Sequence, residues 1–246
     1  HVRTLYRKND LSDFLALGEL ESLALPGESY KLAFTPNIIN TIYVDTGKVS
    51  VTDIDALFKD ESKFVHGDGD TNWWIPSGDI FFSPTTGDSP TQELSFAREH
   101  FFLPHRFRDP FGNETIITYD SDPNDGVRNH NLLLVETRDA LGNVTTARTQ
   151  GDNGNIEFRL DYRVLQPYWA TDPNDNRSQV TFDALGMVVA TAVMGKPGEN
   201  KGDSIENTFE PDPALAQIQN FVNDPWGNAQ GLLMTASTRI LYDLDR

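Results

Sequence analysis

The sequence predicts a mainly β fold, a series of antiparallel β-hairpins with a few short helices. A four-residue pattern, Asp-x-x-Gly, returns along the chain, and β-prone runs follow it. Asp is favoured at the first position of a type I turn and Gly at the fourth. In a hairpin that Gly takes the left-handed conformation that starts the return strand. Each copy therefore predicts a hairpin tip.

The copies differ in spacing but share this turn chemistry. They lie at 109–113, 139–143, 183–186 and 224–228, with a degenerate copy at 172–176. The predicted turn residues are Asp109, Gly112, Asn113, Asp139, Gly142, Asn143, Asp183, Gly186, Asp224 and Gly227. Uneven spacing argues against a rigid solenoid and is compatible with hairpins that carry insertions on some loops. Segments 122–126 and 151–155 have the composition of such inserted tips.

Composition narrows the classes of partner. The 246 residues are enough for one large β domain or two small ones. The net charge of −17 argues against nucleic acid and anionic membranes, which require clustered Lys and Arg. The chain has no cysteine, and no apolar run approaches the roughly 18 residues of a membrane span. Because it starts with His1 rather than Met, we expect a fragment or a processed piece.

The N-terminal part is predicted to be mixed, and we divide the chain into a mixed segment at 1–107 and hairpin repeats at 108–246. The leucines of 11–25 predict a helix that Pro26 and Gly27 end. Strands are expected at 29–34, 38–44 and 48–51, with a turn at 45–47 and a short helix at 53–58.

A second helix is expected at 91–100, because a Pro precedes an acidic first turn. Its residues Leu94 and Ala97, with Phe101 beyond its end, would face the core. The segment 103–108 would enter the first hairpin. Further along, we expect a surface loop at 195–207, a short helix at 213–222 and a closing strand at 236–244. The run 132–135 is apolar on both faces, which predicts burial on both sides.

The segment 66–78 carries the strongest hint of a metal. Asp68, Asp70 and Asn72 alternate as in the start of a calcium loop. The sixth position, however, is Trp73 instead of Gly, and the twelfth is Asp79 instead of the longer Glu. A polar turn that leads into a buried tryptophan pair is the better interpretation.

Three tryptophans are candidate glycan contacts, namely Trp73, Trp74 and Trp169. Indole rings stack on sugars, but adjacent residues of a strand face opposite sides. At most one of Trp73 and Trp74 therefore serves a given surface, and a core role is expected for the other.

Nothing in the sequence predicts an enzyme or a cofactor. The recurring Asp residues have a sufficient role in capping turn amides. The five histidines lack the spacing of metal ligands, the Gly-Lys pair at 195–196 lacks the upstream glycine of a P-loop, and no Gly-x-Ser-x-Gly occurs.

Six motifs, in this order, resemble the RHS-repeat (YD-repeat) portion of the B component of bacterial insecticidal toxin complexes, the Tc toxins. They are Trp-Trp-Ile-Pro-Ser-Gly at 73–78, Phe-Phe-Leu-Pro at 101–104, Asp-Pro-Phe-Gly-Asn at 109–113, Leu-Val-Glu-Thr-Arg-Asp-Ala-Leu-Gly-Asn at 134–143, Asp-Tyr-Arg-Val-Leu-Gln-Pro at 161–167 and Phe-Asp-Ala-Leu-Gly-Met-Val-Val at 182–189. The resemblance is clearest from Tyr30 to Asp245.

The resemblance implies a non-catalytic segment of a hollow β-hairpin shell, or cocoon, that encapsulates a toxic effector before its delivery into a host cell. Its implied partners are the remaining B-component chain, the C component and the enclosed effector polypeptide. The implied location is secreted or cell-surface associated, as part of a larger toxin. The family's β-propeller and autoproteolytic region have no match here. The alternative is a carbohydrate- or receptor-binding β module that uses exposed aromatics such as Trp74, Tyr168 or Trp169.

Overall fold

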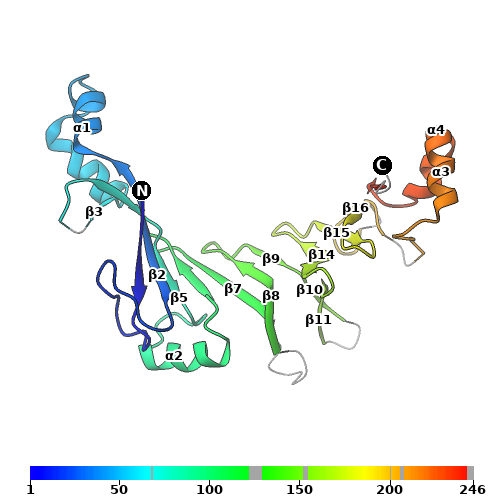
Figure 1. Cartoon of the computed structure of the whole chain (residues 1–246), viewed down its shortest axis with the longest axis horizontal. Helices are drawn as coiled ribbons and strands as arrows, with labels where there is room; N and C mark the ends of the chain where they lie inside the picture. The colour runs from blue at the N-terminus through cyan, green and yellow to red at the C-terminus, as the bar shows by residue number, and fades with distance from the viewer. Residues whose placement is uncertain (68, 122–128, 152–154, 200, 206–207, 243–246) are drawn as a thin grey trace. The chain divides into compact units, whose positions relative to one another are not determined.

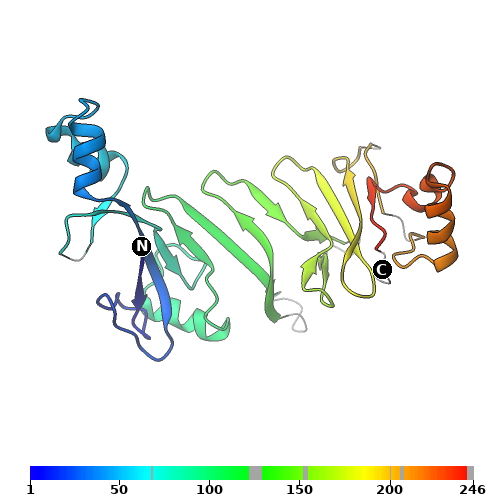
Figure 2. The same cartoon turned by 45° about the horizontal axis from the view of Figure 1, so that its top comes forward.

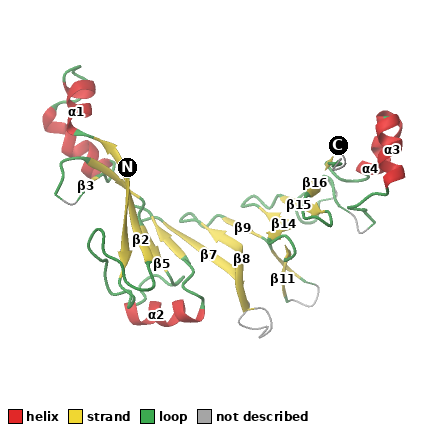
Figure 3. Ribbon diagram, in the orientation of Figure 1, coloured by secondary structure: helices red, strands yellow, loops and turns green. Residues whose placement is uncertain are grey.

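The fold is mainly β and antiparallel, which confirms the predicted fold class (Figures 1 and 3). The computed structural model describes residues 1–67, 69–121, 129–151, 155–199, 201–205 and 208–242. The chain forms two compact units. Unit 1 comprises residues 1–117 and 139–141, and unit 2 comprises 118–138 and 142–246. The expected division after residue 107 was drawn from the repeats and stays a prediction.

Unit 1 contains a four-stranded antiparallel sheet with the order β1-β2-β4-β3. The strands are β1 (Val2–Arg7), β2 (Leu25–Phe34), β4 (Trp73–Pro76) and β3 (Val65–His66). Strand β2 includes the predicted strand at 29–34. Between β2 and β3 lie α1 (Pro36–Ile39) and helical turns at Asn40–Val44, Val51–Asp53 and Ala56–Glu61. The short helix expected at 53–58 is therefore confirmed.

Two strands expected in this region are wrong, because 38–44 is helical and 48–51 leads into a helical turn. Thr35 caps α1 by accepting from the backbone N–H of Ile38, and Pro36 occupies the first turn, where its missing N–H costs nothing. Ile39 and Phe58 then pack with Trp73 in a core cluster. This packing outweighs the β propensity of the isoleucines.

The helix expected at 11–25 is also wrong, since this segment is a loop that returns to β1. The backbone N–H of Leu15 donates to the Tyr6 carbonyl at 2.7 Å, and Phe14 forms a β-bridge with Arg7. Leu11 is fully buried with a φ of +59°, which a helix does not permit. Leu20 and Leu23 are exposed. The leucine spacing therefore reflects one buried anchor and not a helical face.

The second predicted helix is confirmed as α2 (Pro90–Glu99). Ser89 and Gln92 form a capping box at its start. Ala97 is fully buried in a cluster with Leu11, Leu25 and Phe82, and Leu94 packs against that cluster. The expected inward position of Phe101 is wrong: Phe101 is 70% exposed, and Phe102 packs against the cluster instead. Both residues have left-handed φ values, so the chain turns after α2 and places Phe102, instead of Phe101, against the core.

The hairpin series starts in unit 1 with β5 (Asp79–Phe81), β6 (Arg106–Arg108) and β7 (Glu114–Ser121), which pair in that order. Strand β7 runs from unit 1 into unit 2. In unit 2 the order continues with β8 (Asn129–Arg138), β9 (Val144–Thr146), β14 (Trp169–Thr171), β15 (Arg177–Phe182), β16 (Val188–Met194) and β17 (Thr238–Arg239) (Figure 2). Two short hairpins branch from unit 2, β10 (Arg148–Gln150) with β11 (Ile156–Phe158) and β12 (Leu160–Asp161) with β13 (Gln166–Pro167).

The prediction that the run 132–135 is buried on both faces is wrong. Val135 is buried with Ala147 and Leu160, and Leu133 packs against them. Leu132 and Leu134, on the opposite face of β8, are 55% and 44% exposed. Among the described residues of unit 2, the packing layer of this run lies on the face of Leu133 and Val135.

The C-terminal part contains α3 (Leu215–Asn223) and α4 (Pro225–Leu233), and α3 confirms the helix expected at 213–222. The closing strand expected at 236–244 is shorter, since only Thr238 and Arg239 pair with β16, and 243–244 lie outside the described residues. Among the described residues no helix is both long and apolar enough to cross a membrane.

Candidate functional site

In the repeated Asp-x-x-Gly turn, the Asp carboxylate holds the turn by accepting hydrogen bonds from it. At the tip between β6 and β7, Asp109 Oδ1 accepts from the backbone N–H groups of Phe111 and Asn113, each at 2.9 Å. The Asn113 amide donates to the other carboxylate oxygen, Oδ2. Gly112 has a φ of +88°. The hydrogen bond from the Asn113 side chain, followed by its backbone N–H, lowers the pKa of Asp109, so the carboxylate form is favoured.

The same chemistry recurs at the tips 139–142, 172–176 and 183–186. Gly142 and Gly186 have φ values of +84° and +83°, and Asp175 takes the equivalent left-handed position at +63°. Asn143 follows the second tip directly. These tips connect β8 with β9, β14 with β15, and β15 with β16. The inserted tip expected at 122–126 lies outside the described residues, as do residues 152–154 of the tip expected at 151–155. The two ends of that second tip are joined, because the backbone N–H of Gly151 donates to the Asn155 carbonyl at 2.8 Å.

The hairpin tip expected at 224–227 is wrong. Asp224 ends α3 and begins α4, where its side chain accepts from the backbone N–H of Gly227 at 3.1 Å. Asp followed by Pro is favoured both at the start of a type I turn and at the N-cap and first position of a helix. Four residues therefore do not distinguish the two structures. The flanks decide, and here they are helical.

Substitution of Asp183 is expected to weaken its hairpin. Its buried carboxylate accepts from the backbone N–H groups of Leu185 and Met187 at 2.9 and 2.8 Å. We expect Asp183→Ala to lower the free energy of unfolding by about 1–2 kcal/mol, because both amides lose their acceptor. Asp183→Asn keeps an acceptor oxygen and is the matched control in urea denaturation. Equal losses in the two variants would contradict the capping role.

The candidate calcium loop uses its oxygens internally. Asp70 accepts from Arg3 Nη2 at 3.0 Å, from the Asn72 backbone N–H at 3.0 Å and from Trp74 Nε1 at 3.1 Å. Asp68 lies outside the described residues. Within the described ranges no group of three or more His, Asp or Glu side chains is placed to hold a metal ion. The turn and the ion pair account for Asp70 and Asn72.

The three candidate glycan contacts are each at least half-buried. Trp73 and Trp74 are 4% and 2% exposed, and Trp73 belongs to the cluster with Ile39 and Phe58. Trp169 is half-buried in β14, with the Arg177 guanidinium 5.8 Å from its ring centroid. Little of either adjacent indole is therefore available to stack on a sugar.

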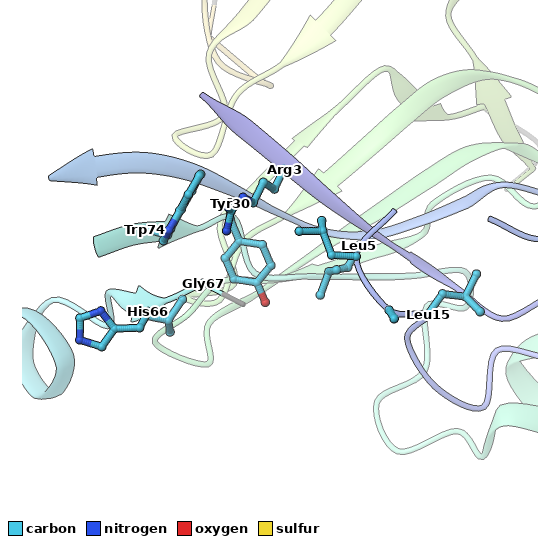
Figure 4. Close-up of a pocket in the computed structure, with 10 residues that line it drawn as sticks. Arg3, Leu5, Leu15, Tyr30, His66, Gly67 and Trp74 are labelled. Atoms are coloured by element: carbon cyan, nitrogen blue, oxygen red, sulfur yellow. The ribbon is translucent and has the colours of Figure 1, made fainter. Parts of the chain in front are cut away.

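Trp74 instead forms part of a pocket in unit 1, with a cavity volume of about 340 Å³ (Figure 4). Its apolar lining comes from β1, from the loop after β1 and from β3. The lining residues are Arg3, Leu5, Leu15, Ala16, Leu17, Tyr30, Val65, His66, Gly67 and Trp74. This pocket joins sequence segments that are more than 50 residues apart.

Arg3, Tyr30 and His66 bring polar groups to this pocket. The Arg3 guanidinium lies 4.0 Å from the centroid of the Trp74 ring, and its Nη2 atom is paired with Asp70. The Tyr30 hydroxyl is hydrogen-bonded to Glu28. Burial, and then this hydrogen bond, raises the pKa of Tyr30, so the phenol stays protonated.

His105 is buried beside α2. Its ring lies 4.9 Å from Phe96 and 5.5 Å from His100, and its Nδ1 atom is 3.2 Å from the Ile117 carbonyl oxygen. Burial, and then the neighbouring His100, lowers the pKa of His105 from 6.5 to about 4.

Because the unfolded state then binds a proton more readily than the folded state, stability contributed by neutral His105 is lost as pH falls from about 6.5 toward 4. Between pH 7 and 5.5 we expect a loss of about 1 kcal/mol in unfolding free energy. Urea denaturation at several pH values checks this. His105→Gln should flatten the dependence, whereas His1→Gln, at the exposed N-terminus, should leave it unchanged. A wild-type slope in the His105 variant would contradict this assignment.

The hairpin series and its short helices define a mainly β protein with a fold related to that of Tc toxin complexes. The chain is similar to the crystal structure of TcdB2-TccC3, with 18% identity and a TM-score of 0.56 over 87% of this chain and 9% of that chain. It is also similar to TcdB2-TccC3-Cdc42 (16% identity, TM-score 0.55) and to the Photorhabdus luminescens Tc holotoxin pore (17%, 0.52), each over 98% of this chain and 11% of the other.

The chain spans about a tenth of the length of these solved chains. At such identities the similarity shows the fold alone. No protein-family model matches the chain, and no curated protein matches it.

Sequence reasoning missed several residues that the structure brings together. Side-chain hydrogen bonds join Arg3 to Asp70, 67 residues apart, and Arg7 to Glu93, 86 residues apart. A third joins Tyr162 to Asp120, 42 residues apart. No local pattern marks these pairs.

Proposed function

We propose that this chain is a structural, non-catalytic segment of a Tc-like toxin shell that encapsulates an effector polypeptide before its delivery. The observation that carries the proposal is the series of Asp-capped hairpins, whose fold aligns with Tc toxin complexes over 87–98% of the chain. A strip of paired hairpins satisfies its backbone hydrogen bonds along the strip and suits a continuous wall. The RHS-repeat motifs specify the B component within this proposal.

The chemistry of the hairpins supports a structural role. The recurring carboxylates of Asp109, Asp172 and Asp183 are engaged by turn amides. Among the described residues, Leu132 and Leu134 give β8 an exposed apolar face. Such a face suits contact with an unfolded polypeptide, which exposes apolar side chains. The proposed partners are the remainder of the B component, the C component and the effector, and the assembly would be secreted.

Protease protection of the cargo tests the proposal. The assembled shell, co-expressed with its partner half and its cargo, is compared with a form that lacks residues 108–194. We expect the intact assembly to shield the cargo and the deletion to expose it. The Asp183→Asn shell, which keeps its turn acceptor, should protect as the wild type does. Equal cleavage of the cargo in the intact and deleted assemblies would contradict encapsulation by this segment.

A further inference from the structure

The helical hairpin formed by α3 and α4 in unit 2 carries almost no charge. The two helices lie side by side at the C-terminal end of the chain (Figures 1 and 2). Between Ala214 and Met234 the sequence has one charged residue, Asp224, whereas 23% of the whole chain is charged. The structure describes every residue of both helices, and none of them is buried. Apolar side chains are therefore exposed here, in a chain whose net charge is −17.

Helix α3 is apolar on two of its sides. Ile218 and Phe221 are partly covered, and each of them lines a cavity within unit 2. Leu215 and Val222 lie about two helical turns apart and therefore share a face. They are 66% and 63% exposed. A helix that is apolar all round is typically covered on all sides, so the face of Leu215 and Val222 fits a partner surface.

Trp226 projects from the start of α4 and is 95% exposed. Hydrogen bonds fix the backbone that carries it. The Asp224 carboxylate accepts from the backbone N–H of Gly227 at 3.1 Å. The Asn228 side-chain amide donates to the carbonyls of Asn220 and Asp224 at 3.2 and 2.9 Å. The indole therefore stands on a rigid helix start, and little backbone ordering opposes its binding. Tryptophan is enriched among the residues that dominate interface energies.

A surface cavity of about 300 Å³ lies on the same hairpin. The lining residues are all partly exposed, so the cavity opens to solvent, and they are Phe221, Ala229, Leu232, Leu233, Arg239 and Leu241. The Arg239 guanidinium is engaged elsewhere, because it donates to the carbonyls of Glu210 and Pro211 at 2.8 and 3.1 Å. The cavity is therefore mainly apolar, and its volume accommodates one indole side chain.

The charges of the chain select the occupant of this surface. No Lys or Arg lies between Lys201 and Arg239, so an anionic partner finds no counter-charge here. A cationic partner finds one carboxylate, Asp224, which already caps α4. An uncharged apolar surface is the remaining match, since charged residues are depleted in the cores of interfaces. The hairpin is itself such a surface.

We propose that two copies of this chain associate through their helical hairpins, with Trp226 of each copy in the cavity of the other. A two-fold contact uses the same patch on both copies, so the patch needs a projection and a matching cavity. This hairpin has both. The self-association goes beyond the shell role and does not rest on it.

The size of the patch predicts a weak dimer. Trp226 buries on the order of 200 Å² when it is covered. Each partner in a stable interface contributes about 800 Å², so Leu215, Val222 and the uncharged remainder of the hairpin have to supply the rest. The net charge of −17 on each copy opposes association. We expect a Kd on the order of 10 µM, and tighter association in salt, because salt screens the repulsion.

Sedimentation equilibrium of the 246-residue chain, whose mass is 27.6 kDa, measures the association. In about 0.5 M NaCl we expect the apparent mass to double as the concentration rises through about 10 µM. In about 0.05 M NaCl it should double only at a higher concentration. Neutral phosphatidylcholine vesicles probe the other occupant, a membrane surface, and we expect the chain not to sediment with them.

Three variants locate the contact. Trp226→Ser removes the projecting indole and Ala229→Trp fills the cavity, so each should weaken self-association about tenfold or more. An equimolar mixture of these two variants should associate more tightly than either alone, because Trp226 of the second still fits the open cavity of the first. Leu141→Ser, at an 88% exposed leucine of unit 1, is the control and should associate as the wild type does. Far-UV circular dichroism checks that each variant is folded.

The proposal is overturned if the chain stays monomeric to about 200 µM in both salts or if Trp226→Ser associates as the wild type does. It is also overturned if the mixture associates no more tightly than its parts, or if Leu141→Ser weakens association equally. Sedimentation with vesicles that is lost in Trp226→Ser would assign the hairpin to a membrane surface and overturn it as well. Because these measurements need no assembled shell, their failure leaves cargo protection unaffected, and loss of cargo protection leaves this association as it stands.

Discussion

Replacing Glu93 with Ala is expected to lower the free energy of unfolding by about 3–5 kcal/mol, among the largest effects in this chain. Glu93 is buried on α2, and its Oε1 accepts from the backbone N–H of Phe82 at 2.7 Å and from Arg7 Nη1 at 2.9 Å. Its Oε2 accepts from Arg7 Nη2 at 3.0 Å. Removing the carboxylate leaves a nearly buried guanidinium and a backbone amide without this partner.

Urea denaturation followed by tryptophan fluorescence measures the change, since Trp73 and Trp74 lie in the same unit. Glu99→Ala, at an exposed position of the same helix, is the control and should change stability by less than about 0.5 kcal/mol. The double variant Arg7→Met with Glu93→Leu should recover most of the loss, because apolar replacements of a buried pair are often neutral. A double variant as unstable as Glu93→Ala would show that the pair itself, and not the orphaned charge, carries the stability.

Replacing Asp120 with Ala is expected to cost about 3 kcal/mol in unit 2. Asp120 is fully buried, and its Oδ1 accepts from the backbone N–H groups of Leu132 and Leu133 at 2.6 and 2.7 Å. Its Oδ2 accepts from the Tyr162 hydroxyl at 2.8 Å. One carboxylate thus connects β7, the start of the apolar run of β8, and the turn after β12.

Two further variants separate the contribution of the backbone amides from that of the Tyr162 hydroxyl. Asp120→Asn keeps an oxygen for the amides and should lose clearly less than Asp120→Ala. Tyr162→Phe removes only the hydroxyl and should cost about 1 kcal/mol. Chemical denaturation, with amide exchange at Leu132 and Leu133 as a local readout, checks both. If Asp120→Ala leaves exchange at these two amides unchanged, Asp120 does not hold this part of β8.

The sequence predicted most of what local chemistry controls. The tips at 109–112, 139–142 and 183–186 followed from Asp and Gly at fixed offsets, because a turn is decided by a few adjacent φ and ψ angles. Helix α2 followed from Pro90 and the acidic first turn for the same reason. The failures at 11–25 and 38–44 arose where burial of Leu11 and Ile39 overrode a local pattern.

The features of the candidate site also separate into those that local sequence controls and those that depend on tertiary contacts. The sequence by itself determined the β class, the acidic surface and the turn carboxylates, which act on amides within four residues. Only the tertiary structure decided that both Trp73 and Trp74 are buried and that Leu132 and Leu134 face outward. It alone joined Arg3 to Asp70 and Arg7 to Glu93. Burial and ion pairing depend on which distant segments meet, and no short stretch of sequence encodes that meeting.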